Sequence, residues 1–365
     1  MGTILDYIRM YGDYTFSEKP ISEVDSLVFG QFAYLKFDGL VPDIEENAAA
    51  VDMQHILLHE NYDDLYADER YREKNTELFL LMAGSKRFGD LKLSNYVNRI
   101  EPEKETQFSA VTIQLGDGTF YIAYRGTDET IVGWKEDLNL AFSEPVPGQL
   151  MSVDYLNRTA GNITQPFYIG GHSKGGNLAV YAAMNCEKAI QDRICVIFNH
   201  DGPGFRPEVK QRCGYDQIEA RIRKTIPHSS LVGMILYSEE NYRVVESKYI
   251  GLAQHDPYSW LIEKDDFRTV KRVYSGRLFV DSTLNDWILS LNQEQIHIFV
   301  DTLYDVVKAS EADNLIDFTA NWKKSIQGIM AAVKNVDPET MKIINKIMKA
   351  LFDEGISHLE QVFKK

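Results

Sequence analysis

The feature that most constrains the fold of this chain is the segment Gly-Gly-His-Ser-Lys-Gly-Gly at residues 170–176. An apolar run precedes it at residues 167–169, and a run with helical character follows at residues 177–184. A chain that turns sharply from a strand into a helix strains the residue at the apex, and small neighbours leave room for that turn. The segment therefore predicts a strand, a tight turn and a helix, with Ser173 at the apex as a candidate nucleophile.

The composition is that of a globular protein with room for one large α/β domain and an appendage, or for two domains. Of its 365 residues, 44% are hydrophobic and 25% are charged. The formal net charge of −15 disfavours a nucleic-acid partner, because both would be negative. Three cysteines without metal-ligand spacing fit a reducing compartment. With no signal peptide and no apolar run of about 20 residues, we expect a cytoplasmic protein without a transmembrane segment.

The order of the predicted elements indicates the fold class. Residues 1–100 are expected to be mainly helical, and two β-rich runs flank a Gly-Asp-Gly turn at residues 116–118, which predicts a hairpin. Further predicted elements are a proline-interrupted loop at 143–150, a helix near 154–159, strands at 167–170 and 194–199, a polar helical segment, and a β-rich pair at 229–238 and 242–247. Alternating strands and helices predict an α/β protein with a mostly parallel central sheet and a helical N-terminal layer.

The last part of the chain has a different pattern. From about Thr283 apolar residues recur at helical spacing, and Asp337 followed by Pro338 is a typical helix start. We therefore expect two parts: an α/β domain at residues 1–280 and a C-terminal helical appendage at residues 281–365.

A serine hydroxyl is a poor nucleophile on its own and needs a general base, which in turn needs an acid to orient it. Asp201 is the predicted acid, because it follows the apolar run at 194–199 and precedes a Gly-Pro-Gly turn, at the end of a predicted strand. The alternative reading makes it a turn-forming residue. Other downstream carboxylates remain in reserve: Glu239, Glu240, Glu246 and Asp256.

The predicted base is His255, which lies in a proline-containing loop after the last β-rich run. His200 is adjacent to Asp201, and neighbours on a strand point to opposite faces. His228 is expected to precede a strand instead of ending one. Where a serine nucleophile lies on a strand-to-helix turn, the acid and then the histidine follow it in the chain. Ser173, Asp201 and His255 occur in this order.

Two backbone amides are candidates for stabilising a developing oxyanion. The amide of Lys174 lies at the predicted helix N-terminus, where helix amides favour negative charge. The amide of Thr127 follows the strand at residues 121–124, and Gly126 allows the chain to turn toward the serine. Because a lysine at a helix N-terminus opposes the helix dipole, we expect an acidic partner for Lys174, with Asp137 first.

These motifs carry a family resemblance. The segment Tyr-Ile-Ala-Tyr-Arg-Gly-Thr-Asp from residue 121, with the later Gly-Gly-His-Ser-Lys-Gly-Gly, resembles the class 3 (fungal-type) lipases. More closely, residues 20–290 resemble lipase-like serine hydrolases of Gram-positive bacteria. The resemblance implies an α/β-hydrolase fold, a nucleophile at Ser173 and an oxyanion residue at Thr127. The Trp and Asp that follow a few positions later in that family would correspond to Trp134 and Asp137.

The chain departs from class 3 lipases at one position. Those enzymes carry the acid of the triad shortly before a Val-Pro pair, whereas here the corresponding residues 223–230 contain Lys224 and no acid. Asp201 instead matches the place used by pancreatic-type lipases, after the strand that follows the nucleophile.

Other kinds of site fit less well. His55 and His59 have helical spacing beside Glu60 but lack a convincing third zinc ligand. The glycine-rich segment also lacks the Gly-Lys-Ser/Thr order of a phosphate-binding loop. The sequence thus predicts a cofactor-independent serine hydrolase for acyl or lipid-like carboxylic esters. The alternative is a hydrolase fold that binds a ligand or protein with little or no turnover.

Overall fold

The computed structural model describes residues 2–66, 71–101, 103, 106–127, 140, 145–211, 214–228, 230, 232–236, 242–249, 251–270 and 289. Apart from Leu289, the predicted appendage at residues 281–365 lies outside this part, so the division at residue 280 stays a prediction. No helix in the described ranges is long and apolar enough to cross a bilayer.

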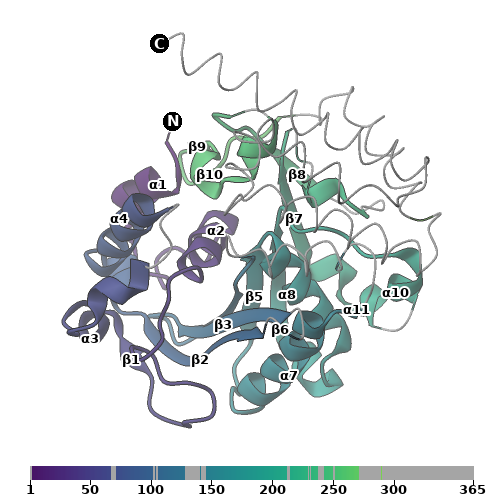
Figure 1. The fold of residues 1–365 in the computed structure, drawn as a ribbon. Coiled ribbons are helices and arrows are strands. Elements are labelled where there is room, and N and C mark those ends of the chain that lie inside the picture. The colour runs from purple at the N-terminus through teal and green to yellow at the C-terminus, as the bar shows by residue number, and fades with distance from the viewer. Residues whose placement is uncertain are drawn as a thin grey trace, which may run out of the picture.

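An eight-stranded sheet runs through the middle of the described fold (Figure 1). Its strands lie side by side in chain order: β1 (Val51–Asp52), β2 (Lys92–Glu101), β3 (Thr106–Gln114), β4 (Phe120–Tyr124), β5 (Phe167–His172), β6 (Ile194–His200), β7 (Ile222–Pro227) and β8 (Tyr242–Val245). Strands β1 to β4 pair antiparallel, and β4 to β8 pair parallel. A separate hairpin joins β9 (Ile262–Glu263) to β10 (Asp266–Phe267). The predicted α/β class with a mostly parallel sheet is confirmed.

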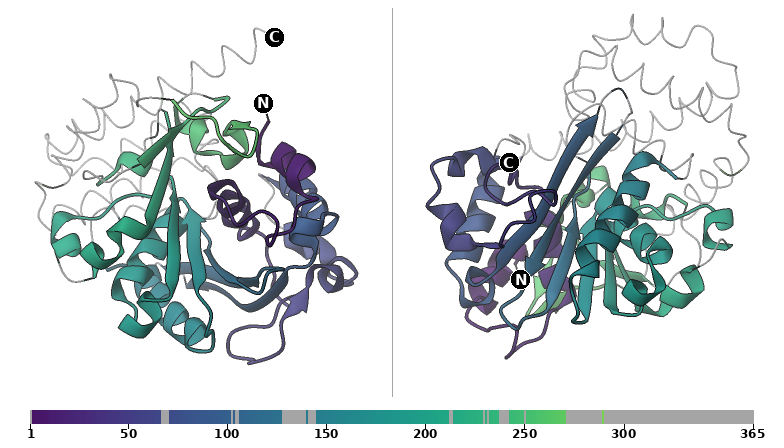
Figure 2. Two further views of the ribbon diagram at one scale, coloured as in Figure 1. Left: turned by 180° about the vertical axis from the view of Figure 1, so that it is seen from behind. Right: turned by 90° about the horizontal axis from the view of Figure 1, so that it is seen from below.

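Helices cover both faces of the sheet (Figure 2). One face carries α1 (Ile4–Tyr11), α2 (Glu23–Phe32), α3 (Met53–Leu57), α4 (Arg72–Ala83) and α5 (Lys86–Gly89); the other carries α7 (Pro147–Gly161), α8 (Lys174–Asn185), α9 (Lys188–Gln191), α10 (Pro207–Gln211) and α11 (Tyr215–Ile218). Alternation along β4 serves both cores: Tyr121 and Ala123 pack with the N-terminal helices, whereas Ile122 and Tyr124 pack with α7 and α8. The predicted N-terminal helical layer therefore covers one face of the sheet.

Short 3₁₀ turns complete the described fold: η1 (Tyr62–Tyr66), η3 (Glu219–Arg221), η4 (Val232–Met234), η5 (Gly251–His255) and η6 (Pro257–Ser259).

Three local expectations were wrong. Strand β2 was expected to be helical; its register shifts between Ser94 and Val97, where Asn95 has a φ of 51°, and this irregularity breaks the alternation of a strand. Helix α7 begins within the expected loop, with Pro147 at its first position, where a missing N–H costs nothing. The third error concerns residues 229–238. These residues were expected to form a strand, but Val232–Met234 within them forms the η4 turn. The strand of this region is β7, which ends before them at Pro227.

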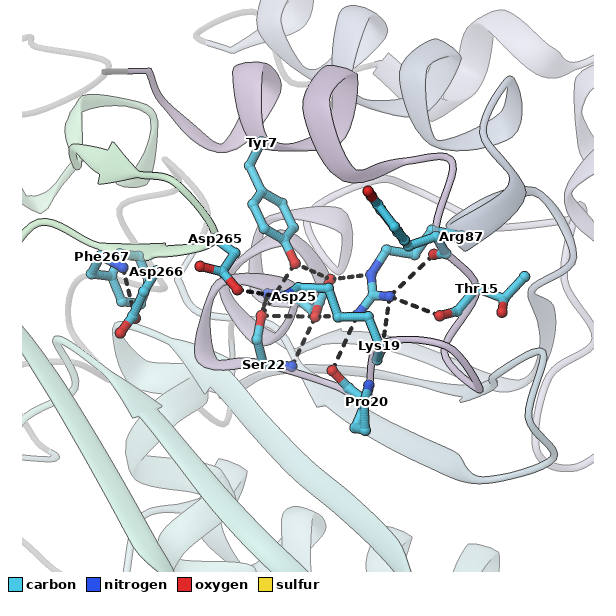
Figure 3. A network of polar contacts seen from close by, with 11 residues as sticks. Tyr7, Thr15, Lys19, Pro20, Ser22, Asp25, Arg87, Asp265, Asp266 and Phe267 are labelled. Carbon is cyan, nitrogen blue, oxygen red and sulfur yellow. Dashed lines mark hydrogen bonds and ion pairs between the residues drawn. The ribbon is translucent and has the colours of Figure 1, made fainter.

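A buried ion pair fixes helix α2, which packs on the central strands β5 and β6 (Figure 3). Arg87 Nε and Nη2 donate to the two carboxylate oxygens of Asp25, each at 2.7 Å, and both side chains are fully buried. Tyr7 also donates to Asp25 at 3.1 Å. The Arg87 guanidinium binds four carbonyls of the loop between α1 and α2, those of Tyr14, Thr15, Lys19 and Pro20. This network ties α2 to α5 and to the loop that leads into α2.

Replacing Asp25 with asparagine should destabilise the fold strongly. The change is nearly isosteric but leaves the Arg87 charge buried without its counter-ion, so we expect a loss of about 3–5 kcal/mol in the free energy of unfolding. Urea denaturation measures this loss. As a control, Asp192→Asn breaks an exposed pair with Lys188 and should change stability by about 0.5 kcal/mol or less. Equal effects of the two changes would contradict a structural role for the buried pair.

Candidate active site

The predicted strand, turn and helix are present around Ser173. Ser173 follows β5 directly, is the N-cap residue of α8, and has φ 58° and ψ −132°. Such a conformation is strained for a residue other than glycine, and strain of this kind is concentrated at functional sites. Its amide donates to the carbonyl of His200 at 2.9 Å, which fixes the turn against the end of β6.

Two glycines allow the turn to lie against β4. A Cβ added to Gly171 would lie 2.4 Å from the Tyr124 carbonyl oxygen, and one on Gly175 would lie 2.2 Å from the same atom. Contacts this short with backbone cannot be relieved by rotating a side chain. The glycines on both sides of Ser173 are therefore required by close packing of the turn on the neighbouring strand.

Gly175→Ala should accordingly lower the free energy of unfolding by about 1–3 kcal/mol, the usual cost of overpacking. The matched control is Gly161→Ala at the end of α7, where an added Cβ meets no atom within 4 Å. That change should be neutral or stabilising by up to about 1 kcal/mol, because alanine favours helix. Denaturation curves of the two variants test the difference, and an equally stable Gly175→Ala variant would show that the turn can move away from β4.

The predicted acid and the predicted base are in contact. Asp201 follows β6 directly, and its Oδ2 lies 2.7 Å from His255 Nδ1. The Asp201 amide donates to the Thr225 carbonyl at 2.8 Å, and its φ of 55° is a conformation that aspartate tolerates better than most residues. Asp201 is 1% exposed, whereas the His255 side chain, at the end of η5, is 28% exposed. An imidazole held by a buried carboxylate and partly exposed to solvent suits a general base.

The His255 ring lies beside the serine turn. Its centroid is 4.6 Å from that of His172, the residue before Ser173. The ring of Trp260 packs against His172, and its Nε1 donates to the Gln254 carbonyl at 2.8 Å. This buried tryptophan thus connects the segment that carries His255 to the end of β5, directly before Ser173.

Two other histidines near this edge have different surroundings. His200 is fully buried, its Nε2 lies 2.9 Å from Ser26 Oγ on α2, and burial lowers its pKa to about 3. His228 follows β7 at the same sheet edge, so the expectation that it precedes a strand was wrong. Its Nε2 lies 3.2 Å from Gln254 Nε2, and burial lowers its pKa. Asp201 therefore contacts His255, while His228 contacts the residue before His255.

The two candidate oxyanion amides lie on neighbouring segments. A Cβ on Gly126 would lie 2.7 Å from the His172 carbonyl oxygen and 2.1 Å from Tyr34 Oη, so the exit of β4 runs directly beside the serine turn. Thr127 is the last described residue of this exit, and Lys174 begins α8. This packing brings the two candidate segments close together.

The Lys174 side chain extends away from the turn to β3. Its ammonium is buried and donates to the Gln107 carbonyl at 2.9 Å, which links the start of α8 to the start of β3. Asp137, the expected partner, lies outside the described residues, as does Trp134.

The reserve carboxylates have other partners where the structure describes them. Asp256 caps the η6 turn through the Tyr258 amide and pairs with Lys74 at 3.1 Å. Glu246 pairs with Arg268 at 2.8 Å. Glu239 and Glu240 lie outside the described residues. Among these candidate carboxylates, where the structure describes them, Asp201 has the contact with His255 that is expected of the acid.

One residue at this site was not predicted from the sequence. Ser230 Oγ donates to Asp201 Oδ1, and Ser230 is 2% exposed. It was expected within a strand, because the apolar residues after it suggested β structure. Ser230 could have been recognised as a candidate only if the sequence had shown that β7 ends at Pro227, because residues just after a parallel strand lie at the candidate site.

The described ranges contain no group of three or more histidine, cysteine, aspartate or glutamate side chains arranged to hold a metal ion. The rings of His55 and His59 do approach each other, at 6.1 Å between centroids. Of the three candidates, Ser173 and Asp201 directly follow the adjacent parallel strands β5 and β6, and His255 lies at the end of η5, after β8.

Comparison with solved structures finds lipases among the neighbours. The Rhizomucor miehei lipase propeptide complex is 16% identical over 54% of this chain and 70% of its own, with a TM-score of 0.33. M37 lipase is 15% identical over 59% of this chain and 70% of its own, with a TM-score of 0.34. Among functionally annotated proteins, none matches the sequence.

The model of the Mbeg1-like family matches residues 82–305, a range that includes β3 to β8 and the serine turn. This match agrees with the lipase-like α/β-hydrolase fold that the sequence motifs predicted, and both the resemblance and the fold are confirmed. Because the matched range covers more than half of the sequence, the chain belongs to the Mbeg1-like family.

Proposed function

We propose that this protein is a serine hydrolase that cleaves carboxylic esters through a covalent acyl-enzyme. The observation that carries the proposal is the 2.7 Å contact between Asp201 and His255, beside the strained turn that holds Ser173. Ser173 follows β5, Asp201 follows β6 and His255 ends the η5 turn, so their proximity is a property of the tertiary fold. Strained serines and buried carboxylate–imidazole pairs are both typical of nucleophilic catalysis.

In the proposed reaction, Ser173 Oγ attacks the ester carbonyl carbon while His255 accepts the hydroxyl proton. Asp201 binds Nδ1, which leaves Nε2 as the nitrogen available to the serine. The protonated imidazole then donates that proton to the leaving alkoxide, and the acyl-enzyme forms. Water, deprotonated by the same imidazole, attacks the acyl carbonyl carbon; as the bond from that carbon to Ser173 Oγ breaks, the imidazolium returns the proton to Oγ, and the carboxylic acid product leaves.

The amides of Thr127 and Lys174 are the proposed oxyanion donors. Support comes from the close approach of the β4 exit to the serine turn and from the position of Lys174 at the start of α8. Donors that are fixed before the reaction stabilise the transition state without reorganising, and each is worth about 10²- to 10³-fold in rate.

The proposed substrate is an acyl ester or a lipid-like ester, and the chemistry needs no cofactor. The family and the fold support a lipase-like hydrolase, and the ester specificity is our extension of that. A cytoplasmic location is likewise proposed, because three cysteines without metal-ligand spacing fit a reducing compartment.

Turnover of p-nitrophenyl esters tests the proposal. We expect the purified full chain to hydrolyse at least one member of an acetate-to-palmitate series well above the buffer rate, with saturation kinetics. If no chain length is hydrolysed while a known esterase is active in the same assay, the alternative of a binding protein with a hydrolase fold is favoured.

A further inference from the structure

The carboxylate of Asp201 has a separate side-chain partner for each of its oxygens. Oδ2 contacts His255 Nδ1 at 2.7 Å, and Oδ1 accepts a hydrogen bond from Ser230 Oγ. Asp201 and Ser230 are 1% and 2% exposed, so water cannot readily replace either contact. We propose that Ser230 is a positioning residue that fixes the Asp201 carboxylate for His255, an inference that rests on the proposed hydrolase function.

The direction of the hydrogen bond follows from the partners of the Ser230 hydroxyl. The Gly233 amide donates to Ser230 Oγ at 2.9 Å, so this oxygen already acts as an acceptor. A hydroxyl has a single proton, and the ionised carboxylate can only accept. The Ser230 proton is therefore directed to Asp201. Hydrogen bonds to charged groups are stronger than neutral ones, which makes this bond well suited to holding the carboxylate.

The turn around Ser230 is itself fixed on the carboxylate. The Ser230 amide donates to the Pro227 carbonyl at 2.9 Å, which ties Ser230 to the end of β7. A Cβ added to Gly233 would lie 2.3 Å from Asp201 Oδ1 and 3.0 Å from Ser230 Oγ, so the η4 turn packs directly over the carboxylate. Ser230 thus connects Asp201 to two rigid segments, the end of β7 and the η4 turn.

This arrangement has a consequence for His255. A carboxylate with one oxygen free can rotate about χ2 and offer either oxygen at varying angles. With Oδ1 held by Ser230, only Oδ2 remains for His255, and the imidazole is presented in one tautomer and one orientation. Orientation of the base by the acid is a large part of what the acid contributes in a catalytic triad.

Three variants test the proposal in the full chain. Ser230→Ala should lower kcat for p-nitrophenyl ester hydrolysis by about 10- to 100-fold, the loss expected for one hydrogen bond to a charged group, with KM changed by about twofold or less. Ser230→Thr keeps the hydroxyl and should recover most of kcat. The control Ser152→Ala removes a buried hydroxyl that donates to the carbonyls of Gln149 on α7 and Leu178 on α8, with no contact to Asp201, and should leave kcat unchanged.

A proton NMR measurement in water separates positioning from folding and from catalysis. The Nδ1 proton shared by His255 and Asp201 should give a downfield resonance in the wild type, and Ser230→Ala should shift or broaden it. If Ser230→Ala leaves both kcat and this resonance unchanged, or lowers kcat only in proportion to lost folded protein, the proposal is overturned. If the wild type hydrolyses no ester, the hydrolase function fails, yet the resonance still reports whether Ser230 positions Asp201.

Discussion

Ser173→Ala is expected to reduce kcat/KM for ester hydrolysis by at least about 10⁴-fold, because it removes the oxygen that forms the acyl-enzyme in the proposed reaction. The residual rate would come from binding and the oxyanion amides alone. Alanine can occupy the same backbone conformation at no greater strain than serine, so the melting temperature should stay close to that of the wild type. Steady-state kinetics on p-nitrophenyl esters, with a circular dichroism melt of each sample, provide the measurement.

A double variant sharpens this test. Residues that act as one unit are strongly non-additive, so His255→Ala should cost about as much as Ser173→Ala, and the combined variant should lose little more. Additive losses would mean that the two side chains act independently. A Ser173→Ala variant that keeps more than a few per cent of activity would remove this serine from the reaction.

Asp201→Asn is expected to lower kcat by about 10⁴-fold while the fold is retained. The amide has nearly the shape of the carboxylate, but its Nδ2 donates where the carboxylate accepts, so His255 would be held in the wrong tautomer. The change in kcat is measured on the same esters, and near-ultraviolet circular dichroism checks the fold.

The matched control for Asp201 is Asp256→Asn. Asp256 is also buried and adjoins His255, but it caps η6 and pairs with Lys74. Its replacement should cost some stability and no more than about threefold in kcat. If Asp256→Asn or Glu239→Gln abolishes turnover while Asp201→Asn does not, the assignment of the acid is wrong.

The serine turn could be predicted from sequence because its requirements are local. The glycines at 171 and 175 are needed where the turn meets the Tyr124 carbonyl, and a strand before and a helix after can be recognised in a few residues. The hairpin of β3 and β4 was equally accessible through its Gly-Asp-Gly turn. Steric requirements between residues close in the chain can be recognised from the sequence, because they restrict which residue types fit.

Contacts between segments far apart in the chain were harder to predict from the sequence. The sequence suggested Asp201 and His255 by their order and by the ends of predicted strands, but their distance depends on how loops 54 positions apart meet. Ser230 was missed because apolar residues after it resemble a strand, whereas they pack in the η4 turn. Asp25 and Arg87 are 62 positions apart, and only the fold shows that they are buried together.

The most direct test of the central claim is labelling of the intact protein with a fluorophosphonate, followed by peptide mass spectrometry. An activated serine attacks the phosphorus and displaces fluoride, which leaves a stable adduct. We predict one adduct per chain, located on Ser173, with labelling much slower in Asp201→Asn. The absence of an adduct at Ser173, while a known esterase is labelled in parallel, would contradict a catalytic nucleophile in this turn.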